Sequence, residues 1–246
     1  MILERLSRAF RQQNWFAVAI ETLIVIVGVV VGFQITAWGN ARAERAEEQE
    51  LLRGLQGEFT EVMADLDLQV AKHRRVERAV ARTLEAIAEV ERSGATRATV
   101  ADTTLAWALV PTTTQFSQGV LDGLLTTGRL GLIRDSDLRK ALSEWEGVLA
   151  DVTEDEVASR AIVTDQLEPI LWRRMDVRAL RTCELLEGTL PRATMAATSE
   201  VPVDAELSGV LATRRYWLRH TILEFSGPQE EGQRILDLVG RSLEER

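Results

Sequence analysis

The longest predominantly apolar run in the chain lies near the N-terminus, from Phe16 to Ala37, between Trp15 and Trp38. As a helix with ~1.5 Å rise per residue, this run and its two tryptophans are ~35 Å long, which is enough to cross a hydrocarbon core of ~30 Å. Tryptophan favours the interface between lipid and water, so Trp15 and Trp38 are expected to anchor the two ends. The pattern predicts one transmembrane helix over residues 16–38.

Four residues inside this run are unusual for a helix that contacts only lipid. Glu21 and Gln34 are polar, whereas Gly28 and Gly32 have the small-residue spacing that lets two helices approach closely. Glu21 precedes Gly28 by two helical turns, which predicts that the carboxyl and the glycines share a face. We therefore assign Glu21, Gly28, Gly32 and Gln34 to a transmembrane interaction face. Two alternatives for Glu21 are a side chain that reaches the headgroups and a carrier of protons.

Beyond the span, apolar positions recur in alternating steps of three and four. The positions are Leu52, Leu55, Phe59, Val62, Leu66, Gln69, His73, Val76, Val80, Thr83, Ile87 and Val90. This heptad pattern predicts that the membrane helix continues as a coiled-coil stalk or as the longest helix of a bundle, up to a stop at Ser93-Gly94. Gln69 and His73 are interpreted as a polar seam layer that fixes register, with a ligand site as the alternative.

The rest of the chain predicts three further helical segments. These are an interrupted return helix over 100–128, a third helix over 136–171 with a restart at the capping-box sequence 153–156, and a last helix from Asp204 that bends near Gly227-Pro228. Residues 176–203 lose the periodicity and predict a long functional or mobile connection. It contains Cys183, which we interpret as a free thiol.

The predicted fold is all-α, with an N-terminal transmembrane helix that continues into an elongated antiparallel helical bundle. The predicted domains are a short basic cytoplasmic tail over 1–15, the transmembrane helix over 16–38 and an extracytoplasmic bundle domain over 39–246. Tryptophans 107, 145, 172 and 217 are distributed along the helical segments and are predicted to form core layers, with an aromatic ligand pocket as the alternative.

Composition narrows the function. The chain has a net charge of −9. Its first 38 residues hold three arginines against two glutamates, a net charge of +1, so the remaining residues carry −10. An acidic domain of this kind predicts no binding to nucleic acid. One cysteine and two distant histidines offer no ligand spacing for a metal, and we expect no cofactor. The sequence contains no phosphate-binding loop or nucleophile elbow, so we predict that the protein is not an enzyme.

Charge does not decide the orientation of the span, because three arginines precede it and Arg42, Arg45 and Arg53 follow it. The short tail and the large acidic domain favour the N-terminus inside and the domain outside the cytoplasmic (inner) membrane, in the periplasm. A cleaved signal peptide is the alternative, since Ala41-Arg42-Ala43 has the form of a cleavage site. The apolar run is about twice the length of a signal peptide's apolar region and contains a carboxylate, which favours an uncleaved anchor.

Two segments resemble an uncharacterised family of bacterial single-span membrane proteins. The first has the form Glu-x6-Gly-x3-small-x-Gln-Ile-x2-Trp, and the second has the form Ser/Thr-Gly-x-Leu-x-Leu-Ile ahead of a helix. The matching residues are Glu21, Gly28, Gly32, Gln34, Ile35 and Trp38, then Gly128, Leu130, Leu132 and Ile133. The chain departs at residues 36–40, where family members often have asparagines. The resemblance implies a membrane anchor with a helical outer domain over the first two thirds of the chain, and no assigned activity.

The function that these patterns favour is that of a membrane-anchored structural or interaction protein. Its expected partners are the lipid bilayer and either further copies of itself, as a homo-oligomer, or another membrane protein in a larger complex. Two alternatives stay open. One is a periplasmic sensory or ligand-binding module that signals through a partner, and the other is a stator-like, ion-coupled subunit that uses Glu21.

Overall fold

The computed structural model describes residues 15–114, 116, 118–178, 180 and 196–244. The side chain of Trp15 and all of Cys183 lie outside the described residues. The chain divides into two compact units, residues 1–51 and residues 52–246, which are described separately. In the described part of the chain helices predominate and two short strands accompany them, which confirms the all-α fold class.

In the first unit, the described residues form the N-terminal part of helix α2 (Trp15–Ser93). This part of α2 is long and apolar enough to cross a membrane, and none of its most apolar window is buried within the chain. Phe16 and Phe33, for example, are each 74% exposed. A core helix of a soluble protein would bury this surface, so the exposed apolar helix agrees with the predicted anchor.

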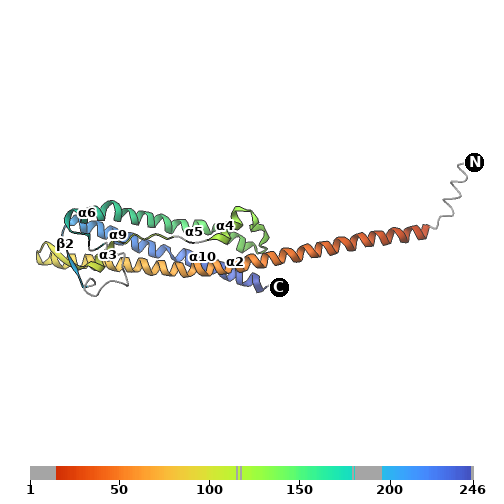
Figure 1. The fold of residues 1–246 in the computed structure, drawn as a ribbon, viewed down its shortest axis with the longest axis horizontal. Coiled ribbons are helices and arrows are strands. Elements are labelled where there is room, and N and C mark those ends of the chain that lie inside the picture. Colours follow the sequence, from red (N-terminus) through yellow and green to blue (C-terminus); the bar gives the residue numbers. More distant parts are fainter. Residues whose placement is uncertain (1–14, 115, 117, 179, 181–195, 245–246) are drawn as a thin grey trace, which may run out of the picture. The chain divides into compact units, whose positions relative to one another are not determined.

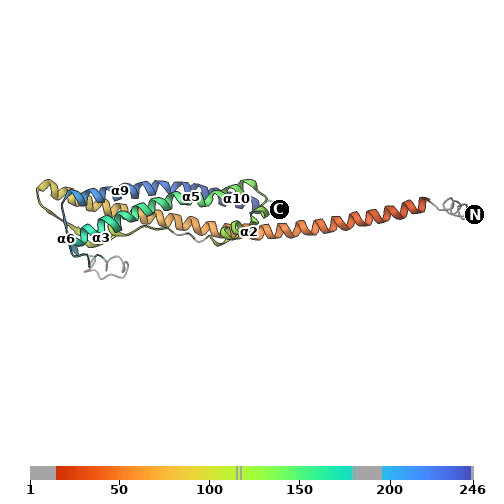
Figure 2. The ribbon, with the colours of Figure 1, turned by 90° about the horizontal axis from the view of Figure 1, so that it is seen from above.

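The second unit is a helical bundle with three long helical segments (Figures 1 and 2). These are α2 from residue 52 onward; α5 (Ser136–Ala161) with its continuation through a π-helix, η2 (Ile162–Leu167), into α6 (Glu168–Arg174); and α9 (Ala205–Glu224) followed by α10 (Ser226–Glu244). The α5 helix runs parallel to α2, because Trp145 packs on Phe59 and Glu156 lies beside His73. The last segment runs in the opposite direction.

The heptad seam of α2 forms part of the core of this bundle. All twelve seam positions from Leu52 to Val90 are buried or half-buried. The Phe59 and Trp145 rings meet edge to face with centroids 5.1 Å apart, and His73 meets Phe225 in the same way. The seam predicted as a coiled coil therefore packs against α5 and α9 of its own chain.

The segment predicted as an interrupted return helix holds two helices, as expected, but a strand precedes the first helix and the non-helical stretch between the two is longer than predicted. It begins with strand β1 (Arg97–Ala101), which pairs antiparallel with β2 (Thr198–Pro202), and with α3 (Asp102–Leu109). The chain is then non-helical at the described positions of 110–118 before α4 (Gly119–Thr126). Pro111 disfavours a helical conformation at the residue before it, and Val110 is extended with ψ 117°.

The distance between α3 and α4 gives a second reason why residues 110–118 are extended. The Trp107 ring of α3 lies 3.9 Å from the Arg75 guanidinium, whereas α4 begins beside Glu58, about 25 Å back along α2 at ~1.5 Å per residue. Nine helical residues span ~14 Å, but nine extended residues span ~30 Å. On arrival, the Glu58 carboxylate accepts hydrogen bonds from Val120 N–H and Leu121 N–H and so caps α4.

Several predicted helix ends are confirmed. The α2 helix ends at Ser93, and Gly94 has a left-handed φ of 78°. Asp204 caps α9 through a hydrogen bond from Leu207 N–H, and the last segment breaks at Phe225, close to the predicted bend. After the 3-10 helix η1 (Arg129–Leu132), Asp135 caps α5 by accepting from the N–H groups of residues 137 and 138.

Two other predictions in this unit were wrong. The predicted restart at residues 153–156 does not occur, since α5 is continuous from Ser136 to Ala161 and Thr153 Oγ1 donates to Leu149 O. Among the tryptophans predicted as core layers, Trp145 is buried and Trp107 and Trp217 are half-buried, but Trp172 is 53% exposed.

Candidate functional sites

The predicted transmembrane face lies on the exposed part of α2. At 100° per residue, Glu21, Gly28 and Gly32 fall within about 40° of one another around the helix. Gln34 lies about 140° away from Glu21, on the opposite side of the helix, so helix geometry separates it from the other three residues. A Cβ built on either glycine meets no other atom of the described chain within 4 Å, apart from the local helix itself. The face is therefore uncovered within this chain.

The end of the apolar run carries Trp38, which is 67% exposed. The Arg42 guanidinium lies 5.7 Å from the centroid of the Trp38 ring, one helical turn further on. An indole beside a cation is apolar on one side and polar on the other, which suits the boundary of a bilayer. The geometry thus agrees with the predicted membrane-interface anchor at this end, whereas the Trp15 side chain is outside the described residues.

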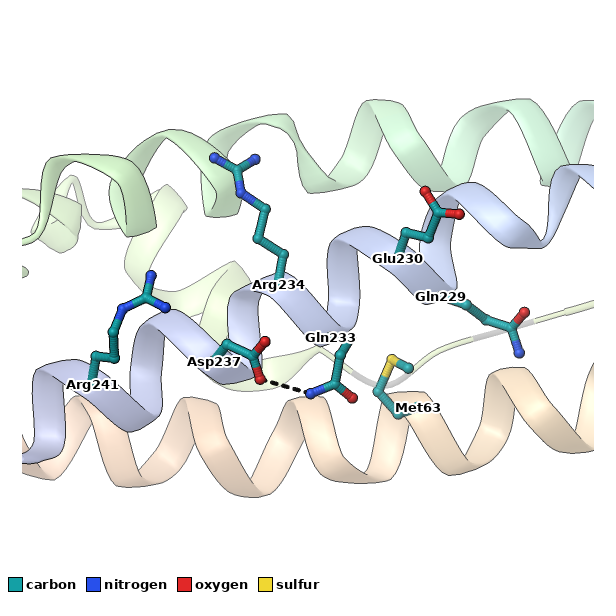
Figure 3. A pocket seen from close by; sticks show the side chains of 7 residues that line it. All are labelled: Met63, Gln229, Glu230, Gln233, Arg234, Asp237 and Arg241. Atoms are coloured by element: carbon teal, nitrogen blue, oxygen red, sulfur yellow. Dashed lines mark hydrogen bonds between the residues drawn. The ribbon is translucent and has the colours of Figure 1, made fainter.

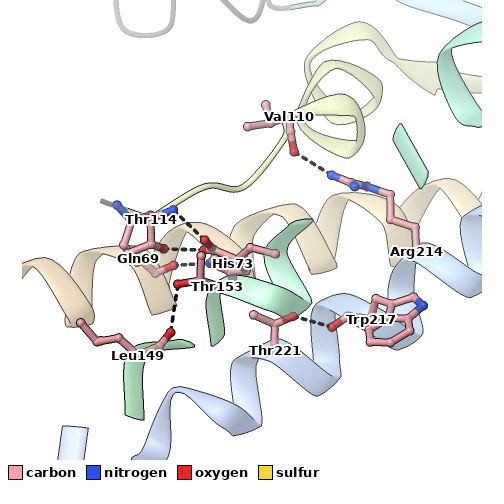
Figure 4. A network of polar contacts seen from close by, with 10 residues as sticks. Gln69, His73, Val110, Thr114, Leu149, Thr153, Arg214, Trp217 and Thr221 are labelled. Carbon is pink, nitrogen blue, oxygen red and sulfur yellow. Dashed lines mark hydrogen bonds and ion pairs between the residues drawn. The ribbon is translucent and has the colours of Figure 1, made fainter. Parts of the chain in front are cut away.

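The polar layer on α2 lies inside the bundle (Figure 4). His73 is fully buried, and its Nδ1 lies 2.9 Å from the carbonyl oxygen of Gln69, which is itself half-buried. On the other side of the ring, Nε2 lies 3.2 Å from Glu156 Oε1, close enough for an ion pair although not aligned as a hydrogen bond. The layer thus joins α2 to a carboxylate of α5 that the sequence analysis did not identify.

Glu156 attaches the extended return segment to the bundle. Its carboxylate is buried and accepts two hydrogen bonds from Thr114, one from the backbone N–H at 2.6 Å and one from the hydroxyl. Because the same carboxylate lies against His73, a single side chain connects α2, α5 and the return segment. Hydrogen bonds to a charged acceptor are stronger than neutral ones, so Glu156 is the main polar attachment at this end of the segment.

Arg214 of α9 holds the other end of the return segment. Its buried guanidinium donates to three carbonyl oxygens, those of Ala108 at 2.8 Å, Val110 at 2.6 Å and Ser159 at 3.1 Å. Burial lowers the pKa of Arg214 to about 9. This value is above neutral pH, so the group remains protonated at pH 7 and a positive charge lies inside the bundle.

The sequence contains a signal for the burial of both Glu156 and Arg214. Leu138, Leu142, Trp145, Leu149 and Val152 follow in steps of four and three, and the next step falls on Glu156. Arg214 occupies the equivalent place between Leu211 and Leu218 of α9. A charged residue at an apolar position of a seam predicts a buried charge with a polar partner, because an unpaired one costs several kcal/mol.

We interpret this network as a structural device that fixes the return segment. Thr112 Oγ1, Ser159 Oγ and Gln69 Oε1 are buried there without a hydrogen-bond partner in the described chain. Among the residues that the structure describes, no three His, Cys, Asp or Glu side chains are grouped to hold a metal ion. The network therefore holds the return segment in place and puts the charged side chains of Glu156 and Arg214 inside the bundle.

Two open grooves lie on the surface of the second unit. The first, of about 530 Å³, lies between α2 and α10 (Figure 3). Met63 lines it from α2, and Gln229, Glu230, Gln233, Arg234, Asp237 and Arg241 line it from α10. Gln233 Nε2 donates to Asp237 Oδ1 at 2.8 Å, and charges of both signs alternate along the groove. The second groove lies on α9 and carries a different pattern, with an excess of cations.

Comparison of the chain with models of protein families, with curated proteins and with solved structures found no match. The resemblance carried by the two sequence motifs is untested by these comparisons and stays a prediction.

Proposed function

We propose that this protein is a single-span membrane protein that binds other proteins, and that its span packs against another transmembrane helix. The observation that supports this proposal is the exposed apolar part of α2, which carries a carboxyl and two glycines on one face. In this proposal residues 1–15 lie in the cytoplasm, and the bundle lies outside the cytoplasmic membrane.

The energetics of Glu21 favour a protein contact over lipid. A charged carboxylate costs about 2.5–3.5 kcal/mol at the centre of a span and less toward its ends. Gly28 and Gly32 let a second backbone approach closely on the same side, where a protonated carboxyl can donate a hydrogen bond to the neighbouring helix. One helix–helix contact thus accounts for the carboxyl and for both glycines.

The packing of the bundle also favours association through the span. Because the heptad seam of α2 is buried or half-buried and packs against α5 and α9 of the same chain, this seam is not free to pair with a second copy. We therefore assign association within the membrane to the span. The partner is a second copy of this chain or a helix of another membrane protein.

A photocrosslinking scan of the span in native membranes tests the proposal. A photoreactive residue is placed at each position from 22 to 36 of the full chain, one at a time. We expect protein adducts at Val25, Gly28 and Gly32, on the Glu21 face, and none at Val30 or Gln34 on the opposite side. The mass of the adducts distinguishes a second copy from another protein. Lipid adducts at every position would contradict the proposal.

A further inference from the structure

The groove on α9 differs from the groove on α10 in its mixture of side chains. It has a volume of about 450 Å³ and is bordered by Leu84 of α2 and by one face of α9. The α9 side chains that matter here are Arg215, Tyr216, Arg219, His220 and Leu223. Their spacings of three, four and seven residues place them along one side of the helix.

The apolar part of this face is unusually exposed. Tyr216 is 62% exposed and Leu223 is 71% exposed, and the two lie two helical turns apart on the same side. Large apolar side chains in a groove with a charged rim are typical of protein interaction sites. Tyrosine and arginine are also the residue types enriched at the energetic centres of such sites.

Two of the three basic side chains on this face have an acidic partner, and the third has none among the described residues. Arg215 Nε donates to Glu77 at 2.8 Å, and His220 Nδ1 lies 2.7 Å from Asp155. Arg219 is exposed and forms no hydrogen bond or ion pair among the described residues. This cation lies between Tyr216 and Leu223 along the helix. In a chain with net charge −9, the centre of the groove thus carries an unneutralised positive charge.

We propose that this α9 face binds an acidic amphipathic helix of a partner protein, with a carboxylate against Arg219 and apolar side chains against Leu84, Tyr216 and Leu223. Charge complementarity selects this occupant. A symmetric contact between two copies centred on this face would bring their Arg219 guanidinium groups together, and like charges in a contact are unfavourable. The inference names the chemistry of the partner for the interaction role proposed above and rests on that role.

Photocrosslinking from Tyr216 tests this inference on the full chain in native membranes. A photoreactive phenylalanine derivative replaces Tyr216, which is 62% exposed, so the aromatic ring of the proposed site is retained. We expect one protein adduct whose crosslinked peptide, read by mass spectrometry, contains Asp or Glu at helical spacing with leucine-type residues. Arg219→Glu should lower its yield about tenfold, which corresponds to ~1.4 kcal/mol of lost attraction. The matched control is Arg160→Glu, an exposed arginine on α5 outside the groove, and it should leave the yield unchanged.

The outcomes separate this inference from the proposed function. An adduct to lipid, to a second copy of this chain or to a peptide without acidic residues would overturn the inference, as would the absence of any adduct or an equal yield in the two arginine variants. A parallel photoreactive residue at Gly32 reports on the span. If Gly32 gives a protein adduct while Tyr216 does not, the α9 inference fails and the proposed function stands. If the span scan fails as well, both fail.

Discussion

Glu156 and Arg214 are single residues on which the course of a long segment depends. Each is a charged side chain inside an otherwise apolar seam, and each binds backbone groups of the return segment. Burying a charge is unfavourable unless hydrogen bonds replace those lost to water. The two residues therefore favour this return path, since other routes would leave each charge with fewer hydrogen bonds.

The first prediction concerns Glu156. Glu156→Gln retains the size of the side chain but brings an amide N–H₂ toward Thr114 and removes the charge beside His73. We expect a loss of about 2 kcal/mol in the free energy of unfolding, measured by urea titration of residues 52–246. The control is Glu154→Gln, an exposed change on the same helix, which should stay within about 0.5 kcal/mol of the unmodified chain. Equal stability of the two variants would remove the role assigned to Glu156.

The second prediction concerns Glu21. Glu21→Gln preserves shape and hydrogen bonding, so we expect it to assemble in membranes like the unmodified chain, whereas Glu21→Leu should weaken assembly although it makes the span more apolar. The crosslinking yield from a photoreactive residue at position 32 measures assembly in both variants. The ion-coupled alternative predicts that Glu21→Gln assembles normally but loses an ion-driven activity. If both variants assemble and act normally, the carboxyl only reaches toward the headgroups.

At the scale of elements, patterns within one segment were predicted well from the sequence. The α2 seam, its stop at Gly94 and the Asp204 cap depend on residues close to one another along the chain, and all are present in the structure. The length of the extended stretch between α3 and α4 was not predicted, because its conformation depends on partners that are distant in sequence. Glu156 lies 42 residues from Thr114, and Arg214 lies 104 residues from Val110.

The same reasoning applies to the strands and to the candidate site. The β1–β2 pair joins residue 97 to residue 202, and neither strand carries a pattern that predicts the other. His73 was singled out because it interrupts the α2 seam. Its partner Glu156 was missed because the sequence around it also reads as a helix start. The capping-box motif at residues 153–156 predicts a helix start, but α5 is continuous there and follows the longer seam.

The third prediction concerns the start of α9. Burial raises the pKa of Asp204, but hydrogen bonds from Leu207 N–H and from Arg174, together with the charge of Arg174, more than offset it, so the pKa lies below the usual 3.8. A carboxylate with a lower pKa in the folded state stabilises the fold above its unfolded-state pKa. We expect this contribution to disappear as the pH falls below about 3.8 and through the folded-state pKa.

Two substitutions separate the two roles of Asp204. Asp204→Asn retains an acceptor for Leu207 N–H but loses the pair with Arg174, so its stability should vary less with pH in the acid range. Asp204→Ala also loses the cap and should cost about 1 kcal/mol at neutral pH. Circular dichroism during urea unfolding at pH 3 and pH 7 gives both quantities. The exposed Asp151→Asn is the control, and an equal pH dependence of all variants would contradict the assignment.

At the scale of the whole molecule, the two units have separate roles in the proposed function. The fourth prediction is that residues 52–246, produced alone, fold as a stable monomer, because their seam is already buried within one chain. Analytical ultracentrifugation of this fragment should give a mass of one chain. The full chain in mild detergent should give a larger protein mass through the span. If the fragment forms dimers, the bundle itself associates and the prediction is wrong.

The fifth prediction is the orientation of the chain. Fusions at the C-terminus should activate a reporter enzyme that works only in the periplasm, and a fluorescent protein that matures only in the cytosol should stay dark. Both reporters are joined through the same linker and give a signal on opposite sides of the membrane, so poor expression would lower both signals and cannot imitate either topology. A fluorescent fusion with an inactive periplasmic reporter would place the bundle in the cytoplasm and reverse the proposed topology.

The extended return segment has a consequence for how the chain is made. Synthesis proceeds from the N-terminus, so residues 110–114 exist before either of the charged side chains that hold them, and Arg214 is made 104 residues after Val110. Strand β1 likewise waits for β2. Contacts between such distant residues form slowly, and the unfinished chain exposes apolar surface meanwhile. The second unit therefore closes only after most of α9 has been synthesised, and until then its apolar surface stays exposed.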